Sequence, residues 1–174
     1  MARSIRVTTR LPTLKATAAE VVAPLAVPRA EAMREALAAA RRGLLAGEPP
    51  VGACVVVDGK VIATAHTAVI AGPDPTAHAE ILALRAACQH ARTPWLSGGD
   101  LYVTVEPCAM CLAASHYAGI ERVWFGASLD EMQAITGREL QGARPPGLRL
   151  EGGVLADECS ALLRAWSATR RRPR

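Results

Sequence analysis

The chain has 174 residues, of which 51% are hydrophobic and only 3% aromatic, and its net charge is +4. This length suits one domain and is too short for two ordinary ones. No apolar run approaches the roughly 20 residues of a membrane span, and the N-terminus lacks the apolar segment of a secretory signal. The five cysteines are an odd number without the spacing of a disulfide framework, so we expect reduced thiols and a cytoplasmic protein.

The positive charge is confined to the two ends of the chain. Residues 1–15 and 170–174 carry four basic side chains each and no acid, which leaves 12 basic against 16 acidic side chains and a body of net charge −4. Phosphate binding needs a basic face, and the body offers none. The ends are therefore interpreted as solvated tails, with a nucleic-acid contact at the C-terminus as the alternative. We predict an N-terminal tail or arm over 1–28, one domain over 29–168 and a basic tail over 169–174. A transit peptide is an alternative interpretation of the arm.

The first half of the domain begins with a helix and a hairpin. Apolar residues on one helical face predict a helix from Arg29 that ends near Gly47. Residues 51–57 and 60–67 are rich in β-branched residues and are joined by Asp58 and Gly59, a strong hairpin signal. A loop with three closely spaced proline or glycine positions follows, and then a helix from about residue 76 to 90.

The second half alternates strands and helices. We predict strands over 101–105, 122–126 and 148–150, and helices over 108–118 and about 129–140. The last helix presents one apolar stripe, made by Leu155, Cys159, Leu162 and Trp166. An initial hairpin followed by this alternation predicts an α/β fold, in which helices cover both faces of a mixed sheet.

Two short motifs, thirty positions apart, carry the chemistry. The first contains His78 and Glu80, and the second contains Pro107, Cys108 and Cys111. One imidazole and two thiols form a ligand set that suits zinc, and three protein ligands leave the fourth tetrahedral position open, as in catalytic rather than structural sites. We therefore predict one zinc ion per chain, held by the histidine and the two cysteines.

Both motifs are predicted at the starts of helices. Asp74 or Thr76 can cap the first helix, and Pro107 suits the first turn of the second. The preceding strands deliver both helix starts to one edge of the sheet, where open α/β folds bind ligands. The free N–H groups there favour anions, which include the two thiolates.

A purely structural zinc site, or no metal, is the alternative interpretation. A closed structural site needs a fourth cysteine or histidine nearby, and His66, His90 and His116 have no motif spacing. Glu80 is not needed as a ligand and is free to act as a general acid and base. Glu106 is a weak further candidate for the site.

The two motifs, together with the order of the elements, resemble the zinc-dependent cytidine and deoxycytidylate deaminase superfamily. The resemblance covers about residues 29–168 and is strongest to the branch of tRNA adenosine deaminase, guanine deaminase and cytosine deaminase. It implies a three-layer α/β/α sandwich with a mixed five-stranded sheet. It also implies hydrolytic deamination, proton transfer by Glu80, and assembly into a homodimer or higher homo-oligomer.

The positions that would recognise a substrate differ from that branch. Thr67 stands where tRNA adenosine and guanine deaminases carry an asparagine, and residues 128–133 are acidic and apolar where the tRNA enzymes approach their RNA. We therefore expect a small amino-substituted base, nucleoside or related heterocycle as the substrate. Wobble adenosine of tRNA is the alternative, and an inactive structural zinc subunit is the remote one. The candidate substrate contacts are Thr67, Ala79 and Pro107.

Overall fold

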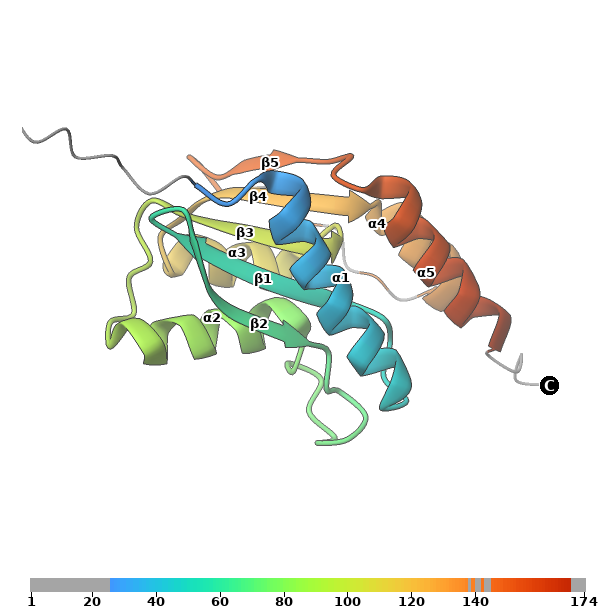
Figure 1. Cartoon of the computed structure of the whole chain (residues 1–174). Coiled ribbons are helices and arrows are strands. Elements are labelled where there is room, and N and C mark those ends of the chain that lie inside the picture. Colours follow the sequence, from blue (N-terminus) through green and yellow to red (C-terminus); the bar gives the residue numbers. More distant parts are fainter. Residues whose placement is uncertain (1–25, 138, 140–141, 143–144, 170–174) are drawn as a thin grey trace, which may run out of the picture.

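The computed structural model describes residues 26–137, 139, 142 and 145–169 (Figure 1). Most of the predicted N-terminal arm and all but residue 169 of the predicted basic tail lie outside this part of the chain. Over the described residues, every helix is too short or too polar to cross a membrane.

A mixed five-stranded sheet forms the middle layer and confirms the predicted fold class. Its spatial order is β2-β1-β3-β4-β5; β1 pairs antiparallel with β2 and β3, whereas β3–β4 and β4–β5 are parallel. The parallel pairing directs the ends of β3 and β4 to the same edge of the sheet. The strands are β1 (Gly52–Val57), β2 (Lys60–His66), β3 (Gly99–Val105), β4 (Ile120–Ala127) and β5 (Arg149–Glu151).

Helices cover the sheet on both faces, as the three-layer prediction requires. In Figure 1, α1 and α5 lie in front of the sheet, and α2 and α3 lie behind it. Helix α4 packs against α5 beyond the ends of β3 and β4. The helices are α1 (Arg29–Leu45), α2 (Ala79–Ala91), α3 (Ala109–Tyr117), α4 (Leu129–Thr136) and α5 (Ala156–Thr169).

Small residues set the spacing between α1 and the sheet. A side chain at Gly52 would place its Cβ 2.1 Å from the carbonyl oxygen of Ala36 and 2.5 Å from the backbone nitrogen of Ala40. Glycine is therefore required where β1 passes beneath α1, since any other residue would force the helix away from the sheet. This close packing fixes the position of the segment between α1 and β1. The segment lies at the edge of the sheet where both motifs lie.

The helix starts differ from their prediction by a few residues. Helix α2 begins at Ala79, with His78 as its N-cap residue, and α3 begins at Ala109, with Cys108 as its N-cap residue. Asp74 therefore does not cap α2; its carboxylate accepts hydrogen bonds from the backbone and hydroxyl of Thr76, in a turn before the helix. Pro107 likewise precedes α3 instead of lying in its first turn.

The third difference concerns α4, which ends at Thr136 instead of near residue 140. Gly137 adopts a left-handed conformation with φ of 69°, and its N–H donates to the carbonyl of Gln133. This arrangement is a common glycine-dependent stop signal for a helix.

Candidate active site

The two helix starts bring the three predicted ligands together. The Sγ atoms of Cys108 and Cys111 lie 3.8 Å apart, and the Nδ1 atom of His78 lies 3.8 Å from the former and 3.6 Å from the latter. Both thiols are buried and the imidazole is half-buried. His78 and Cys108 occupy the equivalent position, the N-cap, of neighbouring helices, so the geometry follows from two matched turns at one sheet edge.

The spacing of these donor atoms fits a zinc ion. A tetrahedral ion with Zn–S bonds of about 2.3 Å and Zn–N bonds of about 2.0 Å separates its ligand atoms by roughly 3.5–3.8 Å. The three observed separations match this range. Over the described residues, the group contains His78, Cys108 and Cys111 without a fourth protein ligand, so one coordination position stays open to solvent or substrate.

The electrostatics of the thiol pair favour a cation. The hydrogen bond between the two cysteine side chains, together with the His78 imidazole, lowers the pKa of Cys108 to about 4. The same hydrogen bond, with burial, raises the pKa of Cys111. The hydrogen bond to Cys108 raises the pKa of His78. A bound metal would hold both sulfurs as thiolates.

Glu80 lies beside the ligands, in the first turn of α2. Its side chain is 3% exposed, and its Oε2 atom has no hydrogen-bond partner among the described residues. Burial raises the pKa of this carboxyl, because a low-dielectric site disfavours the charged form. A buried acceptor without a partner is costly, so the atom is suited to bind a proton-bearing group that enters the site.

A cavity of about 830 Å³ is lined by two of the three ligands, His78 and Cys108, and by Glu80. The predicted contact Thr67 lines it and is 5% exposed. Ala79 and Pro107 are buried and do not line the cavity, so their role as substrate contacts stays a prediction. The lining residues come from five parts of the chain: Gly47, Pro49 and Val51; Thr67, Val69, Ile70, Pro73, Pro75, His78 and Glu80; Val105, Glu106, Cys108 and Met110; Leu129, Met132, Thr136 and Glu139; and Trp166.

The wall contributed by α4 and α5 includes two residues of the segment 128–133, where the resemblance places the RNA contacts of the tRNA enzymes, and Glu139, which was not predicted as part of a site. Glu139 follows α4; its Oε1 atom accepts a 2.7 Å hydrogen bond from the hydroxyl of Thr136, and its N–H donates to the side chain of Gln133 at 2.6 Å. Trp166 from α5 completes this wall. The sequence offers no local signal for Glu139, because a single acid after a helix is usually a solvated surface residue.

Glu106, the weak candidate, lines the cavity directly before Pro107. Its carboxylate accepts a 3.2 Å hydrogen bond from the N–H of Leu129, the first residue of α4. A second glutamate, Glu131, caps α4 through Ser128 and accepts a hydrogen bond from the hydroxyl of Ser160 in α5. The α4–α5 wall is thus connected by hydrogen bonds to the strand that precedes the cysteine motif.

The layered fold and the His–Cys–Cys donor set together define a zinc-binding α/β protein. The sequence model of the cytidine and deoxycytidylate deaminase zinc-binding region matches residues 28–127. The chain therefore belongs to this family, and the predicted resemblance is confirmed.

Curated relatives of this chain are named for tRNA modification. A tRNA-specific adenosine deaminase of Aquifex aeolicus is 47% identical over 95 residues, which are 55% of this chain and 63% of that protein. A tRNA(Ile)-lysidine synthase of Thermus thermophilus is 45% identical over 141 residues, covering 81% of this chain and 25% of its own length. This chain thus matches less than two thirds of either protein. A tRNA-specific adenosine deaminase of Bacillus subtilis is 36% identical over 77% of this chain and 85% of its own.

Solved structures of two kinds resemble the fold. A guanine deaminase from Nitrosomonas europaea superimposes with a TM-score of 0.74 at 31% identity, covering 83% of this chain and 86% of that one. A structure from a study of A-to-I editing by tRNA:A34 deaminases gives a TM-score of 0.67 at 35% identity, covering 76% and 98%. The named substrates of these neighbours therefore include both a free base and a tRNA nucleotide.

Proposed function

We propose that the protein is a zinc-dependent hydrolytic deaminase, in which His78, Cys108 and Cys111 hold one zinc ion and Glu80 is the catalytic acid and base. The observation that carries this proposal is the buried Oε2 atom of Glu80, which has no hydrogen-bond partner among the described residues and lies beside a group of three ligands. A structural zinc site has no need of such a carboxylate, whereas hydrolysis needs a proton acceptor close to the attacking water.

The reaction exchanges an amino group for oxygen. The oxygen of water forms a bond to the ring carbon that bears the amino group, the C–N bond breaks, and ammonia leaves with a carbonyl left behind. Bound zinc supplies the positive charge that brings the pKa of water from 15.7 towards about 7. Glu80 accepts one proton from the water at Oε2, delivers it to the ring nitrogen, and carries the second proton to the departing amine.

The substrate we favour is a free amino-substituted base, nucleoside or related heterocycle. The enclosing wall supports this choice, because the Glu139 carboxylate, held by Thr136, offers an acceptor for ring N–H or amino groups. Thr67 supplies a buried hydroxyl on another wall of the cavity. The fold similarity to a guanine deaminase adds to this support.

Deamination of wobble adenosine in tRNA is the second candidate, and the comparisons support it at least as well. Relatives between 36% and 47% identical carry the name tRNA-specific adenosine deaminase. The net negative charge of the body, which led us to expect a small substrate, does not exclude RNA, because the basic residues near both ends supply phosphate-binding groups.

One preparation of the full chain can decide between the substrates. Ammonia release is measured with guanine, cytosine, adenine, adenosine and cytidine, and inosine formation is measured in a tRNA anticodon stem-loop at physiological salt. Ammonia from one member of the panel supports the small-molecule proposal. Inosine formation with no turnover of the panel establishes the tRNA function instead. No turnover in either assay, with one zinc bound per chain, identifies an inactive zinc subunit.

We further propose that the protein acts as a homo-oligomer in the cytoplasm. Tyr117 at the end of α3 is 76% exposed, and Ala113 and Ala114 on the same helix are half-buried. An exposed aromatic residue on a helix of small residues can form a self-complementary contact with a second copy.

A further inference from the structure

Glu48 is a buried acid outside the cavity that the proposed reaction does not use. It lies between α1 and β1, and its side chain is 1% exposed. Its Oε1 atom accepts hydrogen bonds from the N–H groups of Ile70 at 3.1 Å and Ala71 at 2.7 Å, and its Oε2 atom accepts from Ile70 at 3.1 Å. Over the described residues, this carboxylate forms no salt bridge. Two consecutive backbone N–H groups are thus its hydrogen-bond donors.

These N–H groups belong to the loop of residues 67–78, which joins β2 to α2. The loop contributes five residues to the cavity lining before it reaches His78. Its base is closed by a 2.9 Å hydrogen bond from the N–H of Ala68 to the carbonyl of Ala77. The tip is on the surface, because Ile70 is 64% exposed and Ala71 is also exposed. Side-chain burial therefore contributes little to fixing the position of this tip.

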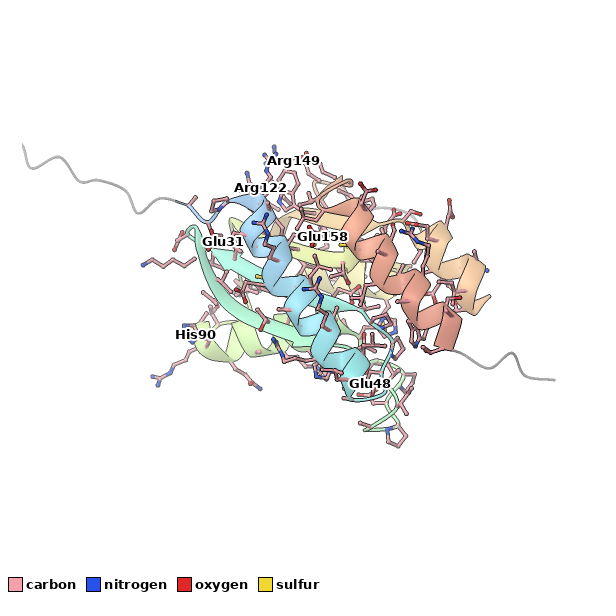
Figure 2. All side chains as sticks on the ribbon, turned by 45° about the vertical axis from the view of Figure 1, so that its right-hand side comes forward. Glu31, Glu48, His90, Arg122, Arg149 and Glu158 are labelled. Carbon is pink, nitrogen blue, oxygen red and sulfur yellow. The ribbon has the colours of Figure 1, made fainter. Side chains whose placement is uncertain are left out.

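A carboxylate suits this position for a physical reason. Consecutive N–H groups that point to one side of a turn form a concave site for an anion. Hydrogen bonds to an ionised acceptor are roughly twice as strong as those between neutral groups. Figure 2 shows Glu48 at the end of α1, next to the β2–α2 loop, and the neighbouring Gly47 and Pro49 line the cavity. The chain before β1 and the loop before α2 thus form adjoining parts of one wall, connected by this side chain.

We propose that Glu48 is a positioning residue for substrate binding, because its carboxylate holds the Val69–Ile70 part of the loop as a fixed wall of the cavity. This inference rests on the proposed deaminase function for its effect on kinetics. Independently of the kinetics, the amides of Ile70 and Ala71 should be protected from hydrogen exchange although their side chains are exposed. Among the described residues, the hydrogen bonds of the Glu48 side chain go to Ile70 and Ala71, and not to the zinc ligands or Glu80, so it acts through the loop.

The first test needs no variant and no substrate. Amide hydrogen exchange of the wild-type protein is followed at Ile70 and Ala71, with the N–H of exposed Gly98, in the turn before β3, as the reference for an exposed turn. We expect exchange at the two loop amides to be at least about 100-fold slower than at the reference, as stable local hydrogen bonding requires. Exchange as fast as at Gly98 would overturn the proposal.

The second test uses Glu48→Gln, which keeps the size of the side chain but presents an NH₂ group to one of the two donors. We expect KM to rise about tenfold while kcat stays within about twofold. The loop wall would bind the substrate and the transition state equally, so its loss weakens binding and leaves the chemical step unchanged. One zinc per chain is retained, and exchange at Ile70 becomes faster. The kinetics are measured with whichever panel compound or tRNA stem-loop the wild type deaminates.

Asp100→Asn is the matched control. It removes a half-buried carboxylate from the pair with Arg122, which Figure 2 shows at the end of the molecule away from Glu48. We expect this variant to keep the wild-type KM and kcat. An unchanged KM in Glu48→Gln would overturn the proposal. Equal changes in both variants would show only a general effect of losing a carboxylate on stability, and would overturn the proposal as well. If the wild type deaminates none of the panel compounds and not the stem-loop, the proposed function fails, and the exchange experiment alone decides the role of Glu48.

Discussion

The Sγ atom of Cys111 lies 3.6 Å from the Nδ1 atom of His78, although 33 positions separate the two residues in the chain. The contact forms because α2 and α3 begin at the same edge of the sheet and pack against each other. No covalent bond holds the two helix starts together. A metal ion between them therefore acts as a cross-link in the folded state.

Removal of the metal is expected to destabilise the protein. We expect one zinc per chain in dialysed protein and a lower melting temperature after chelation, because a ligand that binds only the folded state stabilises it by about 2.7 kcal/mol at a free concentration of 100 times its Kd. Atomic emission spectrometry and thermal unfolding measure the two quantities. A zinc content near zero in fully active protein would contradict the assignment of the site.

Replacement of Glu80 by glutamine is expected to separate metal binding from catalysis. The amide keeps the size of the side chain but cannot carry a proton, so activity should fall by about 10²-fold or more while the zinc content stays at one per chain. Metal analysis and steady-state kinetics on the same preparation test this prediction. Wild-type turnover in Glu80→Gln would remove Glu80 from the mechanism.

Thr67→Val is expected to weaken substrate recognition without unfolding the protein. Valine has the shape of threonine but lacks the hydroxyl, so a hydrogen bond to the base would be lost and kcat/KM should fall by about tenfold. Thr64→Val is the control, because Thr64 is half-buried in β2 and does not line the cavity. If the two variants have equal kcat/KM values, the Thr67 hydroxyl does not contact the substrate.

Tyr117→Ser is expected to weaken self-association. Loss of an aromatic residue from the centre of an interface commonly costs about 2 kcal/mol or more, which corresponds to a rise of roughly 30-fold in the dissociation constant. Light scattering over a dilution series measures the change. Leu45→Ser serves as the control, since Leu45 is 90% exposed on a different helix. A wild-type protein that stays monomeric over the whole series would refute the proposed interface.

The ligand group could be predicted from the sequence because its chemistry depends on residue type and short spacing. His78, Cys108 and Cys111 come together once two helices begin at the same edge of the sheet. Alternating strands and helices place the helix starts there. Helix α2 begins later than predicted because the Asp74 carboxylate accepts hydrogen bonds from the N–H and hydroxyl of Thr76, in a turn that precedes the helix. Local hydrogen bonds of this kind determine the first residue of a helix, which the periodicity of apolar residues does not specify.

The outer wall of the cavity could not be predicted in the same way. Glu139 and Trp166 approach the ligands only because α4 and α5 pack together beyond the end of the sheet. Glu48 reaches Ile70 across 22 positions, and its sequence neighbours Pro49 and Pro50 indicate only that a helix has ended. These contacts depend on tertiary packing, which a pattern read along the chain does not contain.

Trp166, in the last helix, lines the same cavity as Gly47, which directly follows the first helix. During synthesis the chain emerges from its N-terminus, so the ribosome releases the three metal ligands well before it releases α5. A nascent chain can therefore acquire its metal while one side of the substrate cavity is still missing. Activity has to wait for the final helix, and a protein cut short within α5 would hold zinc in a site open to bulk water.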